Sequence, residues 1–131
     1  MSRPFTKFNL REVDDSAAKY GYSDNHEARF PNKLLELEQS GLSLQKLLPG
    51  KRSLFGHSHK IQEELVIVLF GSGRMKLDDE IIKLKEWDAV RVAPGIKQAL
   101  EAGKDGLEFI VIGAPTTPEK DWEIDSEWWK K

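Results

Sequence analysis

From about Ser43 onward, short apolar segments alternate with turn-forming residues, and this spacing constrains the fold more than any other feature of the chain. Segments of this length, interrupted this regularly, are typical of antiparallel sandwiches and barrels. We expect hairpin turns at residues 71–73 and 78–79, where glycine, serine or aspartate interrupts the apolar pattern. The expected strands are residues 64–70, 74–77, 80–84, 89–92, 97–101 and 107–112. The sequence therefore predicts an all-β protein.

The two ends of the chain are less regular than its middle. Residues 33–39 alternate leucine with glutamate, a pattern that suits a short helix or a strand, and we favour extended structure. The C-terminal residues include Trp122, Trp128 and Trp129, three of the four tryptophans. Side chains this large are costly to leave in water, so we expect the tail to pack on the rest of the protein.

Composition excludes several classes of function. The 131 residues suit one domain, and the net charge of −2, with basic residues scattered and in no run longer than two, argues against a nucleic-acid partner. The absence of cysteine restricts any metal site to imidazole, carboxylate and amide ligands. The longest apolar run, residues 65–70, is too short to span a bilayer, and the N-terminus lacks an apolar stretch of signal-peptide length. We therefore expect a cytoplasmic protein with no membrane partner.

The tripeptide His57-Ser58-His59 carries the clearest chemical signal. In an extended strand, residues two apart project to the same face, so both imidazoles can bind one ion. Glu64 lies an odd number of positions away and joins them only if the intervening residues turn the chain and Glu64 opens the next strand. Two imidazoles and one carboxylate form the facial triad of non-haem iron sites, and they also suit zinc, manganese or nickel. Without a metal, the same pattern is a solvated strand face.

The spacing of His57, His59, Glu64 and Gly71 resembles the first sequence motif of the cupins, in which two histidines and a glutamate bind metal and a glycine closes the hairpin. The resemblance implies a small single-domain bacterial cupin, with a double-stranded β-helix, or jelly-roll barrel, as its fold. It covers residues 42–115, which we expect to form the barrel. Residues 1–41 would then be an N-terminal arm and residues 116–131 a tail packed on the barrel.

The second cupin motif is poorly matched. Of its pattern, Gly95 is retained, and Gln98 stands where the family has a third metal-binding histidine. The resemblance thus implies a divalent-metal site formed by His57, His59 and Glu64, with Gln98 as a weak fourth ligand or a hydrogen-bond donor. The alternative is a metal-free binding or sensing module in which these residues bind a small ligand directly. The chain could be an enzyme of dioxygenase, isomerase or lyase type; its sequence does not choose among them.

Three other features have weaker functional interpretations. Gly71 and Gly73 are spaced as in some nucleotide-binding loops, but strand residues follow them, so no nucleotide cofactor is expected. Arg91 interrupts an apolar strand; it either reaches into the pocket to hold an acidic ligand or points outward at a strand edge. His26 lies in a polar stretch and is assigned no role.

The apolar run after Glu64 also predicts an assembly. With period two, Val66, Val68 and Phe70 share the inner face with Glu64, which leaves Leu65, Ile67 and Leu69 pointing outward. Small cupins commonly pair through such a face, so we expect a homodimer that binds a small-molecule ligand. The N-terminal arm or the tryptophan tail could instead cover the same face within one chain.

Overall fold

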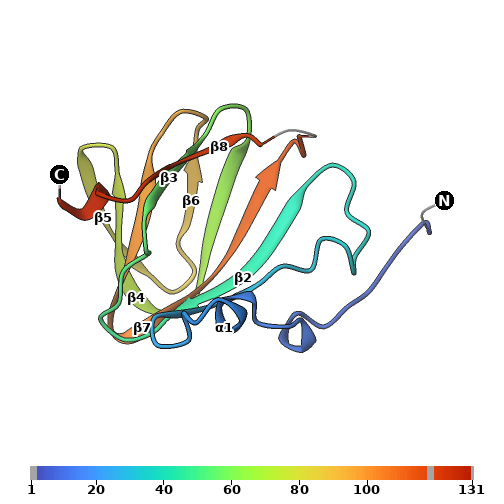
Figure 1. Ribbon diagram of the computed structural model, residues 1–131, viewed down its shortest axis with the longest axis horizontal. Coiled ribbons are helices and arrows are strands. Elements are labelled where there is room, and N and C mark those ends of the chain that lie inside the picture. Colours follow the sequence, from blue (N-terminus) through green and yellow to red (C-terminus); the bar gives the residue numbers. More distant parts are fainter. Residues whose placement is uncertain (1–2, 118–119, 131) are drawn as a thin grey trace.

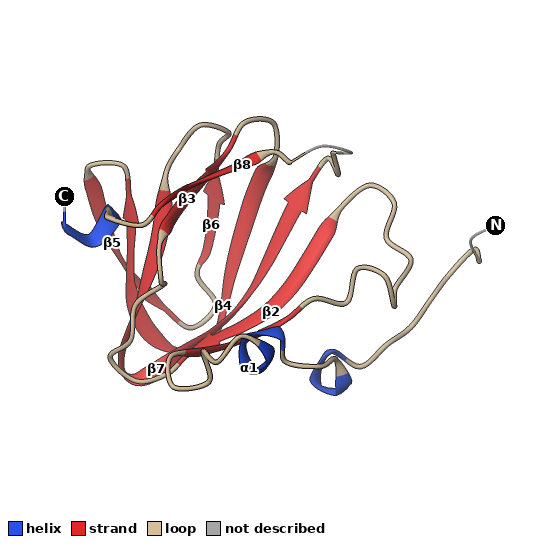
Figure 2. Cartoon of the chain, in the orientation of Figure 1, coloured by secondary structure: helices blue, strands red, loops and turns tan. Residues whose placement is uncertain are grey.

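The computed structural model describes residues 3–117 and 120–130. In it the chain forms an antiparallel sheet that curls into an open barrel of two halves, as Figures 1 and 2 show. The predicted all-β class is confirmed. Residues 1–2 of the predicted arm and 118–119 and 131 of the predicted tail lie outside the described residues. In chain order the elements are η1 (Leu10–Glu12), α1 (Ser16–Lys19), β1 (His26–Arg29), β2 (Gly41–Leu47), β3 (Gly56–His59), β4 (Glu63–Leu77), β5 (Glu80–Lys85), β6 (Ala89–Val92), β7 (Gln98–Ala114), β8 (Trp122–Asp125) and η2 (Trp128–Lys130). Within the described part of the chain, no helix is long and apolar enough to cross a bilayer.

Two long strands, β4 and β7, pair along most of their lengths and run through both halves of the barrel. One half contains β1, β2 and β6 beside the first part of β4 and the last part of β7. The other half contains β3, β5 and β8 beside the remaining parts. The sequence predicted a hairpin at residues 71–73, and this prediction is wrong, because β4 continues through these residues. Residues 102–106 likewise lie inside β7 and do not separate two strands.

The glycines that suggested turns make the two long strands bend together. The β4–β7 register shifts between Val68 and Phe70 and again between Gly71 and Gly73. Gly71 has φ +83°, and a Cβ added there would lie 2.0 Å from the carbonyl oxygen of Gly106. Such bulges bend a strand and increase its twist, and glycine allows the backbones to approach closely. The bend lets one pair of strands serve both halves of the barrel.

The bulges also explain where the apolar side chains of β4 point. Val66 and Val68 are fully buried, as the period of two predicted, and they join the main core of the barrel. Phe70 was predicted to share that inner face, but it is 51% exposed. Because the register shift after Val68 adds a residue to β4, the alternation of inward and outward side chains is reversed at Phe70.

The N-terminal residues contribute one strand and a segment that crosses the outside of the sheet beside β2 (Figure 1). The side chain of Arg11 forms two hydrogen bonds to the carboxylate of Glu108 on β7, at 2.6 and 2.8 Å. Residues 33–39, predicted to be extended, form turns and bends instead. Here the alternation of leucine and glutamate reflects partial burial of a loop, since Leu35 and Leu37 are less exposed than the residues around them.

The C-terminal residues lie along β3, where β8 adds the last strand of the sheet. Trp128 is buried, and its ring packs so closely on the backbone of Gly56 that a Cβ there would lie 2.4 Å from Trp128 Cγ. The ammonium group of Lys76 lies 4.3 Å from the centre of the same ring. These contacts hold the described part of the tail against the barrel, although the exact division into arm, barrel and tail stays a prediction.

Candidate metal centre

A cavity of about 530 Å³ lies inside the barrel and is lined by residues from both of its halves. Its volume falls within the range of roughly 300–1,000 Å³ that is usual for small-molecule sites. His57, His59, Glu64 and Gln98 all line this cavity. The residues that the sequence assigned to a metal site are therefore neighbours in the structure.

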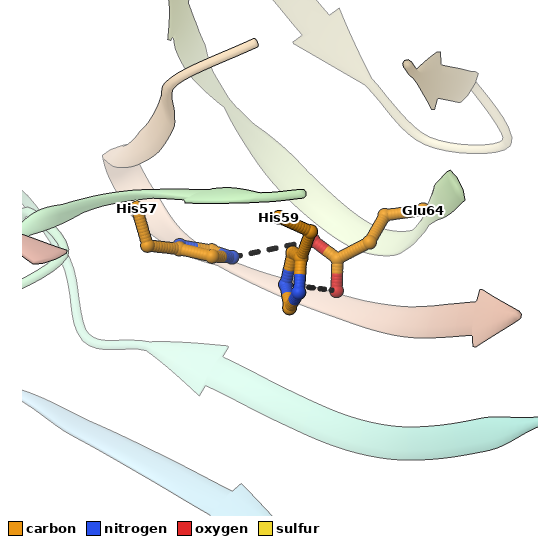
Figure 3. A group of neighbouring side chains, drawn as sticks. All are labelled: His57, His59 and Glu64. Carbon is orange, nitrogen blue, oxygen red and sulfur yellow. Dashed lines mark hydrogen bonds and ion pairs between the residues drawn. The ribbon is translucent and has the colours of Figure 1, made fainter. Parts of the chain in front are cut away.

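The two histidines reach the cavity from the short strand β3. His57 pairs with Gln98 of β7 on one side and with Ile124 of β8 on the other, so β3 is held on both edges. The extended backbone places both imidazoles on the same face of the strand, as the period of two predicts. Figure 3 shows both rings turned toward Glu64, and the two ring planes are nearly perpendicular, at 87°.

Glu64 comes from a different strand and meets the histidines because the chain bends between them. Residues 60–62 leave β3, and β4 begins at Glu63, so Glu64 opens the next strand as the sequence analysis required. Its Oε1 lies 3.2 Å from His57 Nε2 and its Oε2 lies 3.3 Å from His59 Nε2 (Figure 3). The ligand atoms of the three side chains all lie within 4.8 Å of one another.

These separations fit the dimensions of a metal site. Zinc–nitrogen and zinc–oxygen bonds measure about 2.0–2.2 Å, so adjacent ligand atoms around one ion lie roughly 2.8–3.6 Å apart across octahedral and tetrahedral geometries. The two histidine-to-glutamate distances fall in this range. The donor set of two nitrogens and one carboxylate, on the wall of a cavity, is one that accepts divalent transition metals. The group is close enough to hold a single ion.

Gln98 is buried beside this group and acts as a hydrogen-bond donor. Its Nε2 donates to Glu64 Oε1 at a distance of 2.6 Å. The amide thus orients the carboxylate, a role that neighbours of metal ligands commonly have. Of the two roles predicted for Gln98, the donor role matches this contact, and the role of weak fourth ligand stays a prediction.

The ionisation of Glu64 is set by its two histidine neighbours. Burial opposes the charged form, but the hydrogen bonds and positive charge of His57 and His59 outweigh it and lower the pKa of Glu64 to about 2. In turn, the hydrogen bond from His59 to Glu64 raises the pKa of His59, against the effect of burial. Glu64 is therefore a carboxylate at neutral pH, the form that binds a metal.

Asp121 supports the site from the C-terminal tail. Its carboxylate accepts hydrogen bonds from the backbone N–H groups of Lys60, Ile61 and Gln62, at 2.7–3.1 Å. These residues form the bend that joins the histidines to Glu64. Burial opposes ionisation of Asp121, yet the three N–H groups and the neighbouring His59 hold its pKa below the usual value. The carboxylate also lies 3.5 Å from His59 Nδ1.

Sequence reasoning missed Asp121, because its partners lie far away along the chain and no local pattern marks it. It also gave no role to His26, which lines the cavity with its ring stacked on Tyr22 at a centroid distance of 6.0 Å. The polar residues around His26 concealed that β1 carries it to the cavity. The available signal was the alternation of His26, Ala28 and Phe30 with charged residues, which is typical of a strand with one face toward a cavity.

Arg91 is directed away from the cavity. Its side chain is 65% exposed and lies 3.9 Å from the carboxylate of Glu63. Arg91 is not among the described residues that line the cavity. Of its two interpretations, the structure matches an arginine at the outer face of a strand, since β6 pairs with β4 alone among the described strands.

Comparison with known proteins identifies the fold. No family model and no curated protein matches the sequence. A cupin protein from Bacteroides fragilis superposes with a TM-score of 0.72 at 24% identity, covering 91% of each chain. Oxalate decarboxylase from Bacillus subtilis gives a TM-score of 0.77 at 20% identity, over 98% of this chain and 34% of the enzyme. A cupin-superfamily sugar phosphate isomerase from Silicibacter pomeroyi gives 0.70 at 22% identity, over 84% of this chain and 76% of the isomerase.

Proposed function

We propose that this chain, which has the cupin fold that its first motif implied, is a small-molecule-binding cupin whose cavity holds one divalent transition metal ion at His57, His59 and Glu64. The observation that carries the proposal is the meeting of two imidazole nitrogens and one carboxylate, from separate strands, on the wall of a cavity that also has room for a ligand. Iron, zinc, nickel and manganese all accept this set of donors.

Each polar residue has a separate task under this proposal. His57, His59 and Glu64 hold the ion, and Gln98 fixes the carboxylate of Glu64 by its hydrogen bond. Asp121 keeps the bend between the ligands in place through the backbone. A bound ion would supply Lewis-acid chemistry or activate water or oxygen. The similar structures establish the fold, but they are only 20–24% identical to this chain. Fold alone does not assign their substrates to it.

The second candidate is a metal-free binding module, and one observation favours it. Glu64 already has partners within the protein, since Gln98 Nε2 lies 2.6 Å and His57 Nε2 lies 3.2 Å from its Oε1. Glutamine also stands where the family has a third imidazole ligand. In this form the same side chains would bind a small ligand by hydrogen bonds.

Elemental analysis of untagged protein separates the two candidates. The metal site predicts close to one equivalent of a transition metal, together with stoichiometric uptake by stripped protein titrated with iron(II), zinc, nickel or manganese. His57→Ala should abolish uptake, because it removes one of three ligands. His26→Ala is the matched control, since His26 lines the same cavity but lies outside the ligand group. Equal, weak affinities in all three proteins would establish the metal-free form.

The homodimer is proposed on the outer face of β4. Leu65, Ile67 and Leu69 are all partly exposed in the single chain, so a partner sheet could bury them further. Light scattering across micromolar concentrations should give twice the mass of the chain, and Ile67→Glu should reduce it to a monomer. Ile81→Glu, at an exposed position on β5, is the control. A monomeric mass for the unaltered protein would end this proposal.

A further inference from the structure

The cavity has one dense cluster of polar groups on an otherwise mostly apolar wall. His57, His59, Glu64 and Gln98 form the metal centre described above, whereas the surrounding wall is mostly apolar. Leu47, Leu100 and Phe109, which belong to the main core, line the cavity as well. A ligand that fills this space therefore meets this cluster at one place and hydrocarbon over most of its remaining surface, with a few further polar side chains such as Ser43 and Gln45.

Aromatic side chains gather where the cavity meets solvent. Tyr22 and Phe30 lie on either side of β1, Phe55 precedes β3, and Trp122 begins β8. All four line the cavity, and all four are exposed. Exposed rings that surround one opening offer flat apolar faces to a ligand, and aromatic contacts favour another ring by stacking or edge-to-face packing. Residues from separate parts of the chain thus supply exposed aromatic surface to the cavity.

Among the described residues, the cavity wall offers little of the lysine and arginine that phosphate or dicarboxylate ligands need. Lys46 is the one lysine or arginine among the described residues that line it. In the sheet, Lys46 lies opposite Glu27 on one side and Glu108 on the other. Residues directly opposite each other share a face, so Lys46 lies beside Glu27 and beside Glu108, the carboxylate that Arg11 binds on the outside of the sheet. Multiply charged anions normally require several charge-assisted hydrogen bonds.

We infer that the cavity binds a small aromatic molecule with a single hydroxyl or similar oxygen head group, placing the oxygen beside His57, His59 and Glu64 and the ring against the aromatic opening. The inference rests on the proposed function in that it assigns a ligand class to the same cavity. The apolar wall and the aromatic opening act without a metal, so the two proposals can fail separately.

Three probes test the ligand class on metal-stripped protein. The first is 1-naphthol, which has an aromatic body and one neutral hydroxyl. The second is 1-naphthyl phosphate, which has the same ring and a doubly charged head, and the third is sorbitol, which has hydroxyls and no apolar body. Calorimetric titration should show 1-naphthol binding roughly tenfold or more tightly than 1-naphthyl phosphate, because Glu64 repels an anion and Lys46, the one lysine or arginine among the described lining residues, lies between Glu27 and Glu108. Sorbitol should give no measurable heat.

Two phenylalanines of nearly equal exposure provide matched variants. Phe30 is 50% exposed and lines the cavity, whereas Phe70 is 51% exposed and does not line it. Phe30→Ala should weaken 1-naphthol binding roughly threefold to tenfold, the scale of one lost aromatic contact. Phe70→Ala removes a ring of the same size outside the cavity and should leave the affinity unchanged.

The outcomes separate this inference from the metal proposal. Binding of 1-naphthol that is weakened by Phe30→Ala alone supports the ligand class, whether or not the protein takes up metal. Metal uptake without 1-naphthol binding overturns the ligand class and leaves the metal site intact. Tighter binding of 1-naphthyl phosphate by stripped protein, or equal effects of the two phenylalanine substitutions, also overturns it.

Discussion

Replacing Gly71 by alanine tests whether the barrel depends on the close approach of β4 and β7. The new methyl group would meet two obstacles. The backbone at this position is left-handed, with φ +83°, and the Cβ would lie 2.0 Å from the carbonyl oxygen of Gly106. Since the obstructing atom belongs to the backbone of the partner strand, a rotamer change cannot relieve the contact.

Each obstacle has its own cost. A residue other than glycine in the left-handed region costs about 1–2 kcal/mol. Forcing an extra methyl group into a packed region costs about 1–3 kcal/mol more. The free energy of unfolding should therefore fall by about 2–5 kcal/mol in Gly71→Ala. The control, Gly50→Ala, has φ +72° with no atom within 4 Å of the added Cβ, so it meets only the first cost.

Thermal and urea denaturation of the two variants beside the unaltered protein would measure the difference. For a domain of this size, each 1 kcal/mol corresponds to a shift in melting temperature of roughly 3–5 °C. Gly71→Ala should thus melt roughly 6–25 °C below the unaltered protein, and Gly50→Ala roughly 3–10 °C below it. Equal losses in the two variants would refute the argument, because only Gly71 faces another strand.

Three further predictions concern the site and the contacts around it. Gln98→His places an imidazole beside Glu64 and should raise metal affinity roughly tenfold or more in titrations of stripped protein. An unchanged affinity would argue against a metal site at His57, His59 and Glu64. Asp121→Asn should weaken metal binding roughly 10- to 100-fold by loosening the bend at residues 60–62. The control, Asp79→Asn, changes an exposed turn and should have no effect. Equal metal affinities in these two variants would exclude a positioning role for Asp121. The hydrogen bond from Arg52, with a further contribution from Arg74, lowers the pKa of Glu101 in the folded state despite the opposing effect of burial. The stabilisation from ionised Glu101 is present above its unfolded-state pKa of about 4.3 and is lost as the pH falls through its lower folded-state pKa. Glu101→Gln should therefore reduce the free energy of unfolding by at most about 1 kcal/mol at pH 7 and have little effect near pH 2. The same loss at both pH values would contradict this assignment.

The metal group could be predicted from sequence because its geometry is local. His57 and His59 share a face through the strand period of two, which needs no knowledge of the rest of the fold. Glu64 needed one further condition, a bend before the next strand, and the onset of the apolar run indicated where that strand begins. Family spacing supplied the remainder, since it associates these three positions directly.

The errors arose where the same local signal serves two structures. A Gly-Ser-Gly segment between apolar runs is typical of a hairpin, yet it also suits a bulge in one continuous strand. Only the partner strand decides between them, and here β7 passes so close that Gly71 and Gly73 are required. The same bulges turned Phe70 outward. Asp121 escaped notice for a related reason, because its role depends on contacts made by a distant part of the chain.

The nested pairing of β4 and β7 has a consequence for the order in which the protein folds. Paired residues are closest in sequence at Leu77 and Gln98 and farthest apart at Glu63 and Ala114. Closing a shorter loop costs less conformational entropy, so we expect pairing to start beside β5 and to proceed toward Glu64. The carboxylate then reaches the histidines only after most of the sheet has its final register. An ion at this site would therefore stabilise the folded barrel without taking part in the nucleation of folding.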